Sequence, residues 1–307
     1  MQIHAVAIGS AVPRENFDAL IQSVFDSAVN LRLAREDRLI TVLISNRYEL
    51  PQGIRIADKT FPLQSLTVDL PAACRGGILR FNSSALTIDL RGAPVWKCRV
   101  PDLHADMKSL LTQQAWSAAW DLLNKEQILR NADIIADDLF QTDLGSPLSR
   151  RMSKPVMGLV ASTEQFDAPS ALRSAKKMIG LGPGVTPSGD DILIGFLAGL
   201  WSMAGQNQTQ YSFILSFGAE LIRLAKQTSE ISRTYMYHAI RGQFSSSLSH
   251  LAEAIASCKG VEESTQIAMR IGHSSGMDSV TGLLIGQCVW NEKIIPHPIP
   301  QPLRAHL

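Results

Sequence analysis

GLGPGVTPSGDDILIGFLAG, residues 180–199, is the stretch of sequence that decides the fold. Its three alternate glycines let the backbone turn sharply and approach a ligand closely. An apolar run follows, which predicts a helix over residues 188–204 with Thr186 or Ser188 as its cap and Pro187 at its first position. The unpaired N–H groups and the positive dipole end of such a helix make a seat for a phosphate or a carboxylate.

Two nucleotide-binding interpretations of this loop are excluded. A helix is expected before the loop, over residues 170–179, where a dinucleotide-binding unit has a strand. A Walker A loop also needs a lysine directly before its Ser or Thr, and this loop has none. The loop is therefore a candidate anion site of another kind.

A second segment, SGMDSVTGLLIG at residues 275–286, repeats the pattern of SGDDILIGFLAG at residues 188–199. Six of the twelve aligned positions are identical, namely Ser, Gly, Asp, Gly, Leu and Gly. Small residues four positions apart let two helices approach closely. We therefore expect these two helices to pack together with both N-termini facing one cleft.

The shared aspartates of the repeat have two interpretations. Ser188-x-x-Asp191 and Ser275-x-x-Asp278 both have the form of a capping box, which holds a helix start together without any ligand. Alternatively, both aspartates contact the substrate. The sequence leaves both interpretations open.

Asp190 differs from its neighbour because its counterpart in the second copy is Met277. Successive helical residues diverge by about 100°, so Asp190 and Asp191 face different directions. Asp190 is therefore the stronger candidate for a polar contact with a substrate or a metal.

Further polar groups stand near two other helix starts. His273 lies beside Ser274 and Ser275 and is a candidate acid, base or anion donor, with a plain loop histidine as the alternative. Ser232 and Arg233 offer a hydroxyl and a guanidinium that can grip an anion, with a helix cap and a solvated arginine as the alternative.

The predicted site thus has Asp190 and His273 as candidate catalytic residues. The candidate substrate-binding residues are Gly182, Gly184, Thr186, Ser188, Gly189, Asp191, Ser232, Arg233, Ser274, Ser275 and Asp278. No H-x-x-x-H pair or G-x-S-x-G elbow occurs, so neither a helical zinc site nor an α/β-hydrolase is expected. We predict no metal and no cofactor.

Working outward, the sequence divides near residue 102 and predicts an α+β protein. Residues 1–102 alternate short β-prone runs with turns and read as a β-rich, barrel- or sandwich-like domain, with one helix over residues 17–29. Residues 103–290 follow a helical period and form the helical domain that carries the Gly-rich loop. Residues 142–156 are expected to be an exposed loop, and the Pro-rich tail at 291–307 to be extended.

Composition narrows the class of partner and the compartment. The 307 residues carry a net charge of +1, which gives no electrostatic reason for nucleic acid or an anionic membrane. The longest apolar run, residues 192–204, is shorter than the ~18 residues that suggest a membrane span. The four cysteines contain no C-x-x-C pair, which favours a reducing, cytoplasmic location.

Four blocks together resemble the AllH family: the Gly-rich block at 180–199, RGGILRFNSSALTIDLRGAPVWKC at 75–98, ISRTYMYHAIRG at 231–242 and IGHSSGMDSVTGLLIG at 271–286. The resemblance implies a subunit of oxamate carbamoyltransferase in allantoin degradation, a part of purine catabolism. That reaction interconverts oxamate and carbamoyl phosphate with oxalurate and phosphate. The resemblance also implies a hetero-oligomer with FdrA-like and AllG-like subunits, and it carries over no catalytic residues.

Three functions remain as alternatives. In a carbamoyltransferase subunit, the loop and the hydroxyls bind a small anion, Asp190 orients an amide nitrogen, and His273, Ser274 and Ser275 form the opposite wall. A non-catalytic subunit would only bind an anion or assemble with a partner. A metal-assisted hydrolase would use Asp190 with Asp191 or Asp278.

Overall fold

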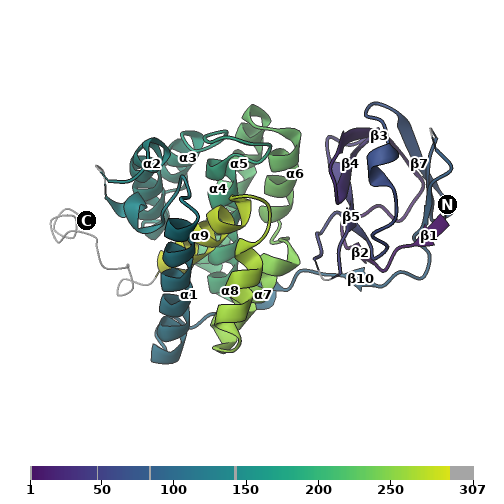
Figure 1. Ribbon diagram of the computed structural model, residues 1–307. Coiled ribbons are helices and arrows are strands. Elements are labelled where there is room, and N and C mark those ends of the chain that lie inside the picture. The colour runs from purple at the N-terminus through teal and green to yellow at the C-terminus, as the bar shows by residue number, and fades with distance from the viewer. Residues whose placement is uncertain (1, 47, 83, 142–143, 291–307) are drawn as a thin grey trace. The chain divides into compact units, whose positions relative to one another are not determined.

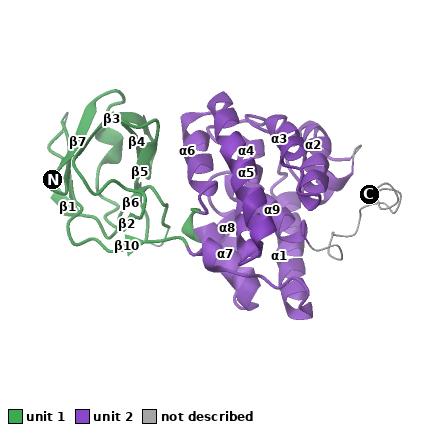
Figure 2. Cartoon of the chain, turned by 180° about the vertical axis from the view of Figure 1, so that it is seen from behind, with its two compact units in different colours: residues 1–98, 243–246 green, residues 99–242, 247–307 purple. Residues whose placement is uncertain are grey.

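The computed structural model describes residues 2–46, 48–82, 84–141 and 144–290. The chain folds as two compact units, one of residues 1–98 with 243–246 and one of residues 99–242 with 247–307 (Figure 2). The tail predicted to be extended, residues 291–307, lies outside the described residues.

The first unit is built on one ten-stranded sheet within the described residues, in the order β1-β9-β8-β7-β3-β4-β5-β6-β2-β10 (Figure 1). Most neighbouring strands are antiparallel, while β1–β9, β5–β6 and β2–β10 are parallel. The strands are β1 (Gln2–His4), β2 (Ala7–Gly9), β3 (Phe17–Val24), β4 (Ala28–Leu33), β5 (Leu39–Ile44), β6 (Gly53–Ile56), β7 (Pro71–Arg75), β8 (Ile78–Phe81), β9 (Thr87–Asp89) and β10 (Val95–Trp96).

The sheet curls because the chain itself joins its two sides. β1 lies at one end of the strand order and β2 near the other, yet only Ala5 and Val6 separate them. The N–H of Ala5 donates to Asp89 O, and the N–H of Val6 donates to Arg55 O, each at 2.8 Å. The curled sheet encloses a single apolar core. The predicted α+β class, with a barrel-like β-rich part before a helical part, is confirmed.

The helix predicted over residues 17–29 is wrong. This segment forms most of the hairpin of β3 and β4. Phe17, Ala19 and Ile21 are buried, whereas Leu20 is 40% exposed, so burial follows the period of two that a strand produces. The error arose because apolar residues at 17, 20, 21 and 24 fit a helical period while those at 17, 19 and 21 fit a strand.

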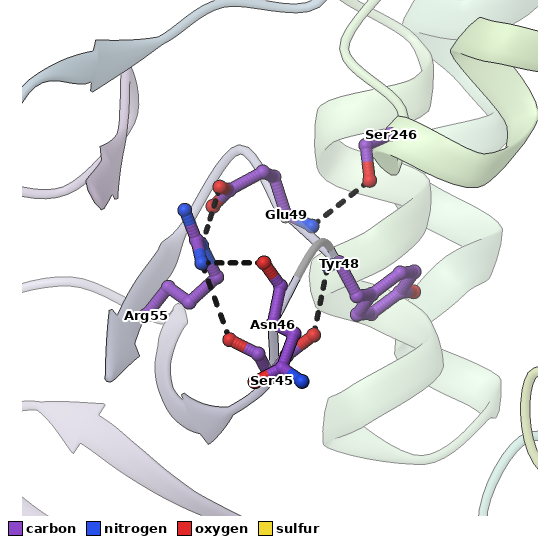
Figure 3. A network of polar contacts seen from close by, with 6 residues as sticks. All are labelled: Ser45, Asn46, Tyr48, Glu49, Arg55 and Ser246. Carbon is purple, nitrogen blue, oxygen red and sulfur yellow. Dashed lines mark hydrogen bonds and ion pairs between the residues drawn. The ribbon is translucent and has the colours of Figure 1, made fainter. Parts of the chain in front are cut away.

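A polar network within the first unit holds the segment 243–246 (Figure 3). Arg55 donates to Glu49 Oε1 at 2.5 Å and to the carbonyl oxygens of Ser45 and Asn46 at 3.2 and 2.9 Å. The N–H of Glu49 donates to Ser246 Oγ at 2.9 Å, and the N–H of Ser246 donates to Glu49 O at 3.0 Å. Arg55 thereby fixes the loop that receives Ser246.

The rest of the described chain is helical. Its helices are α1 (Leu110–Leu129), α2 (Pro147–Glu164), α3 (Ala168–Lys176), α4 (Ser188–Ala204), α5 (Gln208–Leu224), α6 (Glu230–Ala239), α7 (Ser246–Ser257), α8 (Val261–Met269) and α9 (Ser275–Cys288). Every residue of α4 is buried, so this apolar helix is the centre of the second unit. None of the helices in the described ranges has both the length and the hydropathy needed to span a bilayer.

The exposed loop predicted over residues 142–156 is wrong from Pro147 onward, and its first two residues lie outside the described chain. α2 begins at Pro147, and Ser146 caps it by accepting the N–H groups of Leu148 and Ser149 at 3.1 and 3.0 Å. Proline at a first helical position after a serine is a helix-start signal. That signal outweighs the polar composition that suggested a loop.

Candidate functional site

The site is organised by the contact between α4 and α9, which lie side by side (Figure 1). A Cβ added to Gly195 would stand 2.9 Å from the nitrogen of Leu283, and one added to Gly199 would stand 2.7 Å from the nitrogen of Gln287. Moving one turn along α4, from Gly195 to Gly199, moves the contact one turn along α9, from Leu283 to Gln287. The two helices therefore run parallel. The predicted packing, with both N-termini at the same end, is confirmed.

The contact is symmetric, as the sequence repeat implies. A Cβ on Gly195 would collide with the carbonyl oxygen of Ser279, and a Cβ on Gly282 would collide with that of Ile192. Gly195 and Gly282 are equivalent in the repeat, and so are Ile192 and Ser279. A local two-fold axis therefore relates the two helices, which places Asp191 and Asp278 in equivalent positions.

The polar side chains of the two first turns interact across the helices. The hydroxyl of Ser275 acts on the carboxyl of Asp191 and that of Ser188 acts on Asp278, and each lowers the pKa of that carboxyl. Neither helix start has a side-chain cap bond, so the capping boxes predicted within each helix are wrong. The serines and aspartates of the predicted capping boxes do interact, but each serine contacts the aspartate of the other helix. This is possible because the glycines let the two backbones approach closely.

Asp191 and Asp278 form a buried carboxyl pair. They are 4% and 2% exposed, and Oδ2 of each lacks a hydrogen-bond partner among the described residues. Burial raises the pKa of Asp278 to about 7. Burial, and then the charge of Asp278, raise the pKa of Asp191 well above its usual range. Near neutral pH the pair therefore carries less than two negative charges.

Asp190 points away from this pair, as the helical geometry predicted. It is fully buried, and Gly180 donates its N–H to Oδ1 at 2.9 Å while the hydroxyl of Thr228 donates to Oδ2. Burial raises the pKa of Asp190, and these donors act in the opposite direction. Asp190 thus joins the start of the Gly-rich loop to the segment before α6. A contact between Asp190 and a substrate stays a prediction.

A third helix start meets the same loop. Ser229, the N-cap of α6, donates its hydroxyl to Val185 O at 2.6 Å and accepts the N–H of the fully buried Ser232 at 3.1 Å. Thr186 and Ser275 join the loop to the start of α9 through their hydroxyls, 2.6 Å apart. The N-termini of α4, α6 and α9 therefore converge on residues 180–187.

The loop backbone requires its glycines. Gly182 and Gly184 have φ angles of 120° and 91°, which L side chains rarely adopt. Over the described chain, the N–H groups of Gly182, Gly184 and Thr186 donate to no backbone carbonyl, which leaves them as candidate anion donors. The N–H of Gly189 instead donates to Leu181 O at 2.9 Å.

The remaining predicted residues lie at the edge of this region. His273 is exposed in the loop before α9, and Ser274 is half-buried, with its hydroxyl bonded to Asp278. Arg233, on the first turn of α6, places Nη2 3.6 Å from Glu230 Oε1 on its own helix. No group of three or more His, Cys, Asp or Glu side chains that could hold a metal ion occurs among the residues described.

Sequence reasoning missed the roles of Thr228 and Ser229, which tie α6 to the loop. Hydroxyl residues directly before a helix were the available signal, but they suggested an anion contact or a helix cap and not a bond to the Gly-rich loop. It also missed Asp133, whose charge contributes to the raised pKa of Asp278, and no sequence pattern marks that residue.

The fold and site define a two-unit protein whose second unit presents converging helix starts and a buried carboxyl pair. A family model described as oxamate carbamoyltransferase subunit AllH matches residues 178–287, which contain every candidate site residue. A second model, described as the AllH family N-terminal domain, matches residues 4–95. The chain belongs to the AllH family, whose name supports the role of a carbamoyltransferase subunit. No solved structure matches the chain.

Proposed function

We propose that this chain is the subunit of an oxamate carbamoyltransferase that binds the small anionic substrate. The enzyme would interconvert oxamate and carbamoyl phosphate with oxalurate and phosphate during allantoin degradation, in a complex with FdrA-like and AllG-like subunits. The family match supports the reaction class. The four cysteines, all of them free thiols, suit a reducing cytoplasm.

The observation that carries this proposal is the convergence of α4, α6 and α9 on the Gly-rich loop. Three helix N-termini concentrate positive dipole ends and N–H donors in one place. Oxamate and oxalurate carry a carboxylate, and carbamoyl phosphate carries a phosphate, so each of them suits such a seat.

The structure refines the roles that we assign. Gly182, Gly184 and Thr186 would donate to carboxylate or phosphate oxygens, because their N–H groups have no backbone acceptor in the described chain. Asp190 would act as a positioning residue that holds the loop, since both of its oxygens already accept hydrogen bonds.

The second wall of the site would come from the residues before α9. His273 is exposed there and would act as an acid, a base or an anion donor. The half-buried Ser274 and Ser275 follow it in the chain, and their hydroxyls act on Asp278 and Asp191. Arg233 would add a cation from the α6 side.

The experiment is to purify the complex with its partner subunits and to assay phosphate-dependent cleavage of oxalurate. Thr186→Val keeps the N–H of residue 186 but removes the hydroxyl that joins the loop to Ser275, so the loop donors lose part of their support. The rate should fall roughly three- to tenfold, because a neutral hydrogen bond contributes about 0.5–1.5 kcal/mol. Thr209→Val, at an exposed threonine on α5, is the matched control and should leave the rate unchanged.

Absence of activity in every subunit combination would refute the proposal. If the complex is active but needs this chain only to assemble, Thr186→Val will match the control. That result would favour a non-catalytic assembly subunit.

A further inference from the structure

Two oxygen atoms of the carboxyl pair have no partner in the fold. Asp191 Oδ2 and Asp278 Oδ2 are both buried, and each lacks a hydrogen bond to any described residue. Buried polar atoms in folded proteins are nearly always paired, and an unpaired carboxylate oxygen is especially costly. That the two orphan oxygens occupy equivalent positions beside one local axis indicates a common partner.

An ionised carboxylate of the pair can only accept hydrogen bonds, so its partner must bring donors, whereas a carboxyl that keeps its proton can donate to an oxygen. An amide or ureido group brings N–H donors together with a carbonyl oxygen that needs donors of its own. The helix starts beside the pair supply those donors from the backbone. A carboxylate or phosphate, in contrast, has no N–H group to offer to the pair.

We infer that Asp191 and Asp278 together form the subsite that receives the N–H groups of an amide or ureido substrate, while the neighbouring helix starts receive its oxygens. The inference rests on the proposed function and names the part of the substrate that this site recognises. It transfers to the pair the amide-orienting role that the sequence suggested for Asp190.

The charge of the pair fits such a ligand. Two other carboxyl groups act on the pair through their charge: Asp190 helps to raise the pKa of Asp191, and Asp133 helps to raise the pKa of Asp278. Burial, and then repulsion among these groups, favours a protonated pair near neutral pH. A pair that keeps a proton repels a substrate that is itself a carboxylate less than a doubly charged pair would.

The pair lies one layer of side chains below the surface. The hydroxyls bonded to it belong to Thr186, Ser188, Ser274 and Ser275. Ser188 is buried, but the other three are half-buried, and the loop residues beyond them are exposed. A small ligand that approaches from the exposed loop residues would meet these hydroxyls before the two oxygens.

The test compares oxamate with oxalate, which has an oxygen in place of the amide nitrogen. Titration calorimetry on the full chain, alone and in its complex, should give an affinity for oxamate roughly tenfold or more above that for oxalate. Asp191→Asn and Asp278→Asn should each abolish most of this preference. Asp121→Asn, at an exposed aspartate of α1, should preserve it.

Equal binding of oxamate and oxalate, or binding of neither, overturns the inference. Turnover in the complex is measured separately, so an active complex without the preference rejects this subsite and leaves the proposed function intact. A chain that prefers oxamate in an inactive complex rejects the proposed function instead. If an Asn variant does not fold, N,N-dimethyloxamate, which lacks N–H groups, must bind the wild-type chain no better than oxalate does.

Discussion

Replacing Asp278 by Asn should make the protein more stable at high pH and leave its stability almost unchanged at low pH. The pKa of this buried carboxyl is raised from 3.8 to about 7, so the folded state holds its proton more tightly than the unfolded state does. The stability that this proton provides is complete below pH 3.8 and is lost as the pH rises toward 7. Asn has nearly the same shape and no charge, so the variant avoids that loss.

The size of the effect follows from the rise in pKa. The rise is about three pH units, and each is worth about 1.4 kcal/mol, which gives a ceiling of about 4 kcal/mol at pH 8. Solvent and structural relaxation reduce this value, and half of the ceiling, about 2 kcal/mol, is a realistic expectation. In a domain of this size such a gain raises the Tm by about 4–8 °C.

Urea unfolding of wild type and variant at pH 4.5 and pH 8 measures the difference directly. Ionisation of groups that do not interact with Asp278 cancels in that difference. Asp191 does not cancel, because its pKa falls when the charge of Asp278 is removed, and this adds to the gain of the variant at pH 8. Equal stability changes at both pH values would show that the carboxyl is not strained by burial. A variant that is less stable than wild type at pH 8 would refute the reasoning altogether.

Three further substitutions test other contacts by thermal melting. Gly195→Ala forces a Cβ against the backbone of α9 and should destabilise the protein by about 1–3 kcal/mol. The control Gly158→Ala meets a movable serine hydroxyl and should be neutral or slightly stabilising. Equal shifts in Tm would contradict the close packing of α4 and α9. Asp190→Asn turns an amide donor toward a backbone or hydroxyl donor and should cost about 1–3 kcal/mol, so an unchanged Tm would exclude its positioning role. Arg55→Met leaves the carboxylate of Glu49 unpaired and should lower the free energy of unfolding by about 2–3 kcal/mol, less than the loss of a fully buried pair would. A smaller loss at pH 4 than at pH 8 would show that the charge of Glu49 is the cause.

The sequence predicted the helical part of the fold better than the β-rich part. α4 was recognisable because a long apolar run behind a Pro-Ser start has only one plausible structure. The strands of the first unit are two to eight residues long, and several of them pair with strands that are distant in sequence. Short apolar runs fit a helix and a strand equally well, so residues 17–29 were assigned to the wrong period.

The candidate site could be located from the sequence, but its internal contacts could not. The repeat correctly indicated that the two helices pack with their starts together. A capping box within one helix and a crossed pair between two helices use the same residues, and only the distance between backbones distinguishes them. The partners of Asp190 lie 10 and 38 residues away and carry no periodic signal.

The symmetry of the carboxyl pair raises the question of how an asymmetric substrate is held in one orientation. The two aspartates are equivalent, but their surroundings differ. The α4 side has a long Gly-rich loop anchored by Asp190, whereas the α9 side has a short loop and, at the position of Asp190, the buried side chain of Met277. The N–H groups of Gly272, His273 and Ser274 before α9, like those of the Gly-rich loop, donate to no backbone carbonyl in the described chain, so the two sides differ in the length and anchoring of their loops. The two loops would orient the ligand, and the pair of Asp191 and Asp278 would recognise its amide group. An insertion of glycines before α9 should therefore weaken orientation without removing the preference for oxamate over oxalate.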